Sequence, residues 1–148
     1  MTHEFNIIGL AVRTTNANGQ LAEDLGKLWG QFMSEVAFKI PNAISEEIIA
    51  IYTDYESDYQ GSYTAIIGKK VRSLGDIPKG MIGREFPVGK FQKFTAKGEM
   101  PTAVLQTWQA IWKQDMTLHR AYHYDFEVYG EKSQNGDQSE VDIFVSLK

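Results

Sequence analysis

The sequence predicts an α+β fold in which a strand, a helix and a β-hairpin occur twice in succession. Three observations predict it. The spacing of apolar residues changes twice between the period of a strand and that of a helix, and turn-forming residues separate the segments. The two helical patterns also superpose, because Leu25, Trp29 and Phe32 keep the same spacing as Val104, Trp108 and Ile111.

In the first half, residues 7–15 form the expected opening strand, which ends in the turn-rich segment Asn16-Ala17-Asn18-Gly19. A helix follows and must end before Pro41, which lacks the N–H that a continuing helix needs. Its expected buried face consists of Leu21, Leu25, Leu28, Trp29, Phe32 and Val36. The β-branched and aromatic segments 48–55 and 63–71 then predict two strands joined by a hairpin at 57–62.

The second half repeats this order. Residues 90–96 alternate apolar and polar, and Pro101 suits the first turn of a helix. Residues 122–129 and 141–147 predict the last two strands, with a polar loop at 132–139. The expected helix has a buried face of Val104, Leu105, Trp108, Ile111 and Trp112. A join at 73–83 divides one domain, 1–148, into repeats of about 1–75 and about 80–148.

Composition excludes several classes of protein. The chain is 43% hydrophobic and 12% aromatic, which is enough for a sizeable core. It has no cysteine, which excludes disulfides and thiolate metal sites. No signal peptide or membrane span is predicted. A formal charge of -4 is the wrong sign for a protein that tracks phosphates, so we expect no direct nucleic-acid contact. We also expect no membrane contact and a cytoplasmic location.

Motifs for nucleotide or acyl-transfer chemistry are absent from the sequence. There is no GxxxxGK[ST], GxGxxG or GxSxG pattern. His119 and His123 are four residues apart, but no third ligand lies at a fixed spacing from them. The sequence therefore predicts no metal and no cofactor.

Acidic residues interrupt the penultimate strand in an unusual way. Strand alternation places Asp125, Glu127 and Tyr129 on one face, and Tyr124, Phe126 and Val128 on the other. The apolar set is expected to pack against the helices, which leaves the acidic face to a pocket or to water. A carboxylate partly removed from water would gain strongly from a cationic ligand.

Five segments, taken in order, resemble the GyrI-like domains, which also form the effector-binding part of AraC-type and MerR-type multidrug-sensing regulators. They are IIGLAVRTTN, LGKLWGQF, IAIYTDYESDYQGSYTAIIG, WQAIW and YDFEVYG. The resemblance implies two βαββ repeats around an aromatic pocket, and a buried glutamate that neutralises a lipophilic cation. Glu127 matches that position. Because the two repeats use the whole length, we expect a stand-alone bacterial binding protein without a DNA-binding domain of its own.

The expected ligand-binding residues are Glu127, Trp108, Trp112, Tyr52, Tyr55, Tyr63 and Tyr129. Trp29 and Phe32 are expected in the core. Tyr52 and Tyr55 differ in parity, so only one of them should face the pocket from a regular strand.

The expected function is the binding of small amphipathic organic molecules, with cations favoured, and with a link to transcription regulation or drug resistance. One alternative is a hydrolase of strained electrophilic compounds, in which Glu127 acts with a second acid such as Asp54 or Glu56. Another is an inhibitor of a protein partner such as DNA gyrase. An enzyme is the less favoured class. A homodimer through edge strands also stays open.

Overall fold

The computed structural model describes residues 5–58, 60–87 and 89–148. The main elements up to residue 86 are β1 (Phe5–Thr15), α1 (Gln20–Gln31), β2 (Ile48–Thr53), β3 (Ser62–Val71) and β4 (Ile82–Phe86). Those of the second half are β5 (Phe91–Lys97), α2 (Thr102–Lys113), α3 (Asp115–Leu118), β6 (Tyr124–Tyr129) and β7 (Glu140–Ser146). A π-helical turn, Phe32–Val36, extends α1. The predicted α+β class is confirmed.

The strands form one antiparallel sheet in the order β4-β1-β3-β2-β6-β7-β5. The two halves of the chain meet where β2 pairs with β6, and Ala50 lies opposite Glu127 there. The order strand, helix, hairpin occurs as β1-α1-β2-β3 and as β5-α2-β6-β7. The predicted repeat boundaries, about 1–75 and about 80–148, stay a prediction.

Strand β4 is an addition that the sequence did not predict. It lies within and just after the segment interpreted as a join, and it pairs with the outer edge of β1, where Ile7 lies opposite Arg84. The strand has only five residues and includes Gly83, so it lacks the apolar alternation that identified the other strands. Pairing with β1 therefore forms it where local pattern does not.

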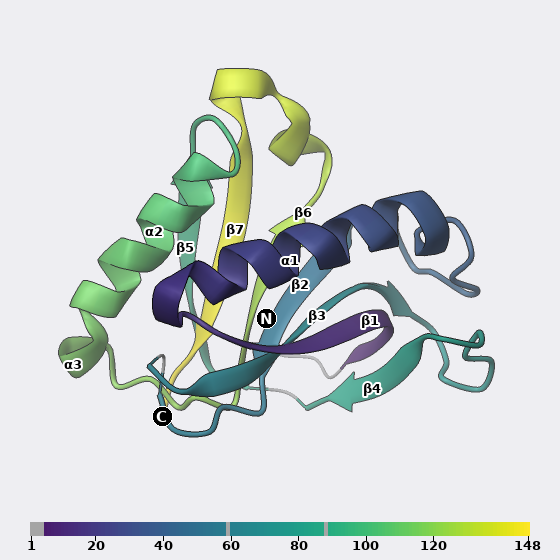
Figure 1. The fold of residues 1–148 in the computed structure, drawn as a ribbon, viewed down its shortest axis with the longest axis horizontal. Coiled ribbons are helices and arrows are strands. Elements are labelled where there is room, and N and C mark those ends of the chain that lie inside the picture. Colours follow the sequence, from purple (N-terminus) through teal and green to yellow (C-terminus); the bar gives the residue numbers. More distant parts are fainter. Residues whose placement is uncertain (1–4, 59, 88) are drawn as a thin grey trace.

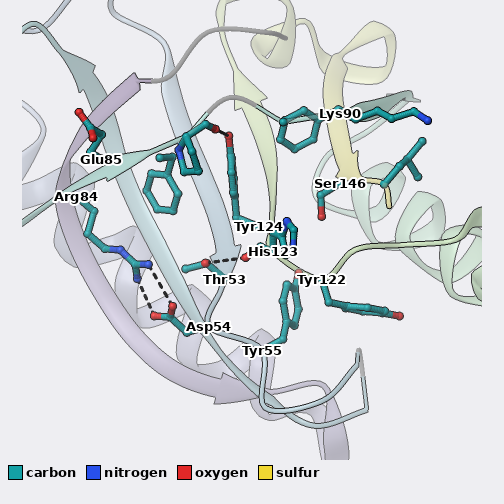
Figure 2. A pocket seen from close by; sticks show the side chains of 15 residues that line it. Thr53, Asp54, Tyr55, Arg84, Glu85, Lys90, Tyr122, His123, Tyr124 and Ser146 are labelled. Carbon is teal, nitrogen blue, oxygen red and sulfur yellow. Dashed lines mark hydrogen bonds and ion pairs between the residues drawn. The ribbon is translucent and has the colours of Figure 1, made fainter.

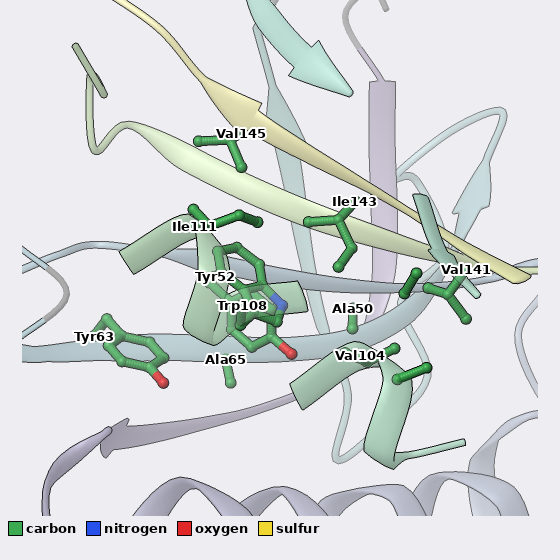
Figure 3. Close-up of a cluster of buried hydrophobic side chains, with 12 residues drawn as sticks. Ala50, Tyr52, Tyr63, Ala65, Val104, Trp108, Ile111, Val141, Ile143 and Val145 are labelled. Atoms are coloured by element: carbon green, nitrogen blue, oxygen red, sulfur yellow. The ribbon is translucent and has the colours of Figure 1, made fainter. Parts of the chain in front are cut away.

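Both long helices lie on one side of the sheet (Figure 1), α1 against β1 and α2 against β5. Two clusters of buried side chains hold them there. The half of α1 nearest its C-terminus, together with the π-helical turn, packs Leu28, Phe32 and Val36 against β1 and β3. Ile111 and Val104 of α2 pack against β7, as Figure 3 shows. Complete burial of an aliphatic side chain such as Ile111 stabilises a fold by about 1.5–3 kcal/mol.

In the part of the chain that the structure describes, no helix covers the other face of the sheet, yet a cluster of its side chains is buried. Its cluster comes entirely from strands: Phe5, Ile7, Ile49, Ile51, Ile66, Phe86, Tyr124 and Phe126. The rings of Phe86 and Tyr124 are 4.9 Å apart, although β4 and β6 are separated by four strand spacings, roughly 19 Å in a flat sheet. The sheet is therefore strongly curved, and its helix-free face is the concave one.

This curvature corrects the expectation for Tyr124, Phe126 and Val128. They were predicted to pack against the helices, but they lie in or against the strand-only cluster. Glu127 and Asp125 point to the helix side instead. Alternation assigns side chains to two faces without saying which face the helices cover, and curvature removes the concave face from water without any helix.

Glycine is required at one position where β1 and β3 pair. Gly9 of β1 lies opposite Gly68 of β3. A Cβ on Gly9 would be 2.0 Å from the carbonyl oxygen of Ile67, and one on Gly68 would be 2.4 Å from that of Ile8. Only glycine permits this close approach of the two backbones.

Candidate functional site

A cavity of about 640 Å³ lies between α1, α2 and the helix side of the sheet. Each helix contributes side chains from consecutive turns, Leu21, Leu25 and Trp29 from α1, and Leu105, Trp108 and Trp112 from α2. Curvature accounts for the space, because helices on the convex face of a bent sheet diverge instead of packing together. All seven predicted site residues line this cavity: Tyr52, Tyr55, Tyr63, Trp108, Trp112, Glu127 and Tyr129. Their contact with a ligand stays a prediction.

Glu127 lies at the floor of the cavity, with 1% of its surface exposed. Three neutral donors hold its carboxylate. The Trp108 Nε1–H donates to Oε2 at 2.5 Å and the Tyr129 hydroxyl donates to Oε1 at 2.6 Å. The Tyr52 hydroxyl is the third hydrogen-bond partner. Among the described residues, Glu127 forms no ion pair.

Burial raises the pKa of the Glu127 carboxyl above its ordinary value of 4.5, because the charged form loses its hydration. The hydrogen bonds from Tyr129, Trp108 and Tyr52 act in the opposite direction and do not cancel this effect. The negative charge of Glu127 is therefore costly, and among the described residues it is stabilised only by the dipoles of its hydrogen-bond donors.

Asp125 lies two residues earlier on the same face of β6, and its surroundings differ. It is 0% exposed and pairs with the guanidinium of Arg120 at 2.8 Å. It also accepts hydrogen bonds from the Tyr55 hydroxyl and from the backbone N–H and hydroxyl of Ser146. The Arg120 guanidinium lies over the rings of Tyr122 and Trp108, 4.3 and 5.8 Å from their centroids. Asp125 is thus compensated within the fold.

Both Tyr52 and Tyr55 line the cavity, against the expectation that their parity separates them. Strand β2 ends at Thr53, and Asp54 has a left-handed backbone with φ of 52°. This residue breaks the alternation and turns Tyr55 to the same side as Tyr52. Regular strand geometry, on which the expectation rested, does not extend that far.

Asp54 itself faces away from the cavity. Its carboxylate accepts two hydrogen bonds from Arg84 of β4, at 2.6 and 3.1 Å, in a second, smaller pocket of about 400 Å³ (Figure 2). The Arg84 guanidinium holds the pKa of Asp54 below its ordinary value of 3.8. Tyr55 lies between the two pockets and lines both. The acid considered as a second carboxylate for hydrolysis therefore belongs to the other pocket, and Glu56 does not line the cavity.

Trp29 and Arg120 are among the cavity-lining side chains that sequence reasoning missed. Trp29, expected in the core, lines the cavity with its ring 4.9 Å from that of Tyr129. Phe32 is fully buried as expected. Helical spacing cannot separate the two, because one apolar stripe passes over the cavity and then over the sheet. Arg120 also lines the cavity, and its position in a loop before β6 gave no pattern to identify it.

No cluster of three or more metal-binding side chains occurs in the described part of the chain. No helix in that part is long and apolar enough to cross a membrane.

Comparison with known proteins identifies relatives along the whole chain. The model of the family described as Cass2, integron-associated effector binding protein, matches residues 2–147. YobU of Bacillus subtilis, named as a transcriptional regulator, is 30% identical over 146 residues, 95% of this chain and 90% of YobU. The transcriptional regulator BrlR of Pseudomonas aeruginosa is 26% identical over 133 residues, 84% of this chain. The aligned part is 47% of BrlR, about half of that protein.

Solved structures share the fold. An integron cassette protein from the mobile metagenome of Vibrio cholerae is 28% identical with a TM-score of 0.77, covering 99% of this chain and 92% of that one. The structure of SAV2435 bound to tetraphenylphosphonium has a TM-score of 0.80 at 18% identity, covering 99% of this chain and 90% of that one.

Proposed function

Because the chain belongs to the Cass2 family of integron-associated effector-binding proteins, we propose that it binds bulky organic cations between α1 and α2, with Glu127 as their counter-charge. One observation carries the proposal. Glu127 is a buried carboxylate with only neutral partners among the described residues, and it faces a cavity whose walls are mostly aliphatic and aromatic.

Electrostatics favours a cation over a neutral molecule of the same shape. A unit positive charge about 5 Å from the carboxylate gains about 3 kcal/mol at an effective dielectric constant near 20. Rings of tyrosine and tryptophan around the cavity attract a cation by a further ~0.5–2 kcal/mol each. Apolar walls bind the body of the ligand without directional demands, which favours a broad range of compounds.

The relatives support the choice of ligand class and its biological use. SAV2435 holds the lipophilic cation tetraphenylphosphonium, and this chain shares its fold. YobU and BrlR are named as transcriptional regulators. We infer that occupancy of the cavity serves as a signal in transcription regulation.

Tryptophan fluorescence provides the test, since the chain has three tryptophans and all of them line the cavity. Titration with tetraphenylphosphonium should change the emission saturably. Glu127→Gln should raise the dissociation constant by about tenfold or more, equivalent to about 1.4 kcal/mol. A neutral four-ring analogue should bind the wild type and the variant equally.

Asp142→Asn is the matched control. It removes one negative charge from β7, next to β6, but its side chain faces the concave side of the sheet with Val128. Its affinity for the cation should equal that of the wild type. Equal weakening by the two variants would attribute the effect to net charge, and equal binding by wild type and Glu127→Gln would refute the role of Glu127.

Hydrolysis and inhibition of a protein partner stay alternative predictions. Three donors already engage the carboxylate of Glu127, which favours recognition of charge over abstraction of a proton from water.

A further inference from the structure

We infer that the cavity prefers cations whose charged centre carries no hydrogen-bond donor, such as quaternary ammonium, phosphonium or delocalised aromatic cations, over protonated amines. The inference rests on the proposed function and specifies the ligand class of the same cavity. It follows from the way in which Glu127 is enclosed.

The carboxylate of Glu127 faces the cavity but is largely enclosed by its own hydrogen-bond donors. Both oxygens accept hydrogen bonds, Oε2 from Trp108 and Oε1 from Tyr129, and Tyr52 supplies a third. Only 1% of the residue is exposed. A ligand cation therefore feels the charge through a layer of aromatic side chains and does not form a direct N–H···O bond with the acid.

A protonated primary amine needs such bonds. Its three N–H donors are strongly hydrated, and removing them from water without acceptors of similar strength costs several kcal/mol. The side-chain amide and hydroxyl of Gln109 and Thr102 lie on exposed positions of α2, near the rim. The deeper acceptors are neutral oxygens, such as those of the Tyr55 and Tyr63 hydroxyls, which donate their own protons to Asp125 and Asn16. Neutral oxygens compensate an ammonium group less than a carboxylate does.

A donor-free cation avoids this cost. Its charge is spread over methyl or aryl groups, its hydration is weaker, and it contacts ring faces favourably. Long-range attraction to Glu127 acts on both kinds of cation, so the difference between them is set by desolvation.

The test compares 4-phenylbutyltrimethylammonium with 4-phenylbutylammonium by calorimetric titration at neutral pH. A neutral pair in which carbon replaces nitrogen measures what the added methyl groups contribute by size alone. After this correction, the dissociation constant of the primary amine should be at least about tenfold larger than that of the quaternary cation, and we call the ratio of these two constants the corrected ratio. A corrected ratio near one, or tighter binding of the primary amine, would overturn the inference.

Tyr129→Phe tests the stated cause. It deletes one donor and frees Oε1 of Glu127, so it should narrow the corrected ratio by about threefold or more. Tyr52→Phe should act in the same direction and serves if the first variant does not fold. Tyr124→Phe deletes a hydroxyl from the same strand on the opposite face, where it donates to Pro87, and should leave the ratio unchanged. An unchanged ratio in Tyr129→Phe and in Tyr52→Phe would overturn the inference.

Failure of this inference is distinguishable from failure of the proposed function. If both cations bind equally and Glu127→Gln weakens both, cation capture stands and donor discrimination falls. If neither these cations nor tetraphenylphosphonium binds, both proposals fall.

Discussion

Two neighbouring positions on one face of β6 hold buried carboxylates in opposite surroundings. Around Asp125, the fold supplies a guanidinium and three further donors, so the charge is neutralised inside the protein. Around Glu127, it supplies only Trp108, Tyr129 and Tyr52. The residues are two positions apart on one face, so strand geometry does not cause the difference.

The difference separates a structural acid from a recognition acid. A buried charge is stabilised by a partner of opposite charge, and Asp125 has such a partner within the fold, the Arg120 guanidinium. Glu127 has no partner of opposite charge among the described residues, and it faces a cavity. The hydrogen bonds from neutral donors reduce the free-energy cost of the buried negative charge of Glu127. Neutralising each acid in turn should therefore have opposite consequences.

The largest expected effect is on stability at Asp125. Asp125→Asn leaves the Arg120 guanidinium with only Asp115, at 3.4 Å. Breaking a buried pair in this way typically costs about 3–5 kcal/mol, so the free energy of unfolding in urea should fall by that amount. The added replacement Arg120→Leu should recover part of the loss. A loss below about 1 kcal/mol would remove the distinction between the two acids.

A smaller effect concerns pH and binding. Only ionised Glu127 attracts a cation, and burial raises its pKa above 4.5. Affinity for tetraphenylphosphonium should therefore increase as the pH is raised above 4.5 and level off once Glu127 is ionised, by about tenfold in total. Titration of Glu127→Gln over the same range should give a flat profile. A slope that persists in this variant would assign the titration to another group.

The smallest effect is on stability at Glu127. Because the pKa is raised in the folded state, the folded protein binds this proton more tightly than the unfolded chain does. The stabilisation is present below pH 4.5 and is lost as the pH rises through the raised pKa. Glu127→Gln lacks this loss, so its stability relative to wild type should improve with rising pH, by less than the loss expected for Asp125→Asn. Thermal unfolding at several pH values measures it, and a relative stability that falls with pH would contradict a raised pKa.

Much of the fold follows from the sequence because its elements have strong local periods. The two long helices and six of the strands were predicted near their observed bounds. The short helix α3 was not predicted, and neither was β4, which depends on pairing with β1. The seven candidate residues also line one cavity, which alternation and the family resemblance together indicated.

What the sequence did not predict depends on tertiary geometry. Curvature decided which face of β6 the helices cover, and one left-handed residue, Asp54, brought Tyr55 into the cavity. Trp29 packs against the core as expected and also lines the cavity, which helical spacing alone did not indicate. None of these features has a periodic signature, and the ion pair of Asp125 with Arg120 spans a loop that has no pattern of its own.

The bend of the sheet divides one helix between two selective pressures. Leu21 and Leu25, at the start of α1, lie over the cavity, whereas Phe32 and Val36, at its end, lie in the core. Descendants of this chain that meet new compounds can change the first pair while inheriting the second. Diversity within the family should therefore be greater at the start of α1 than at its end and in the π-helical turn that follows.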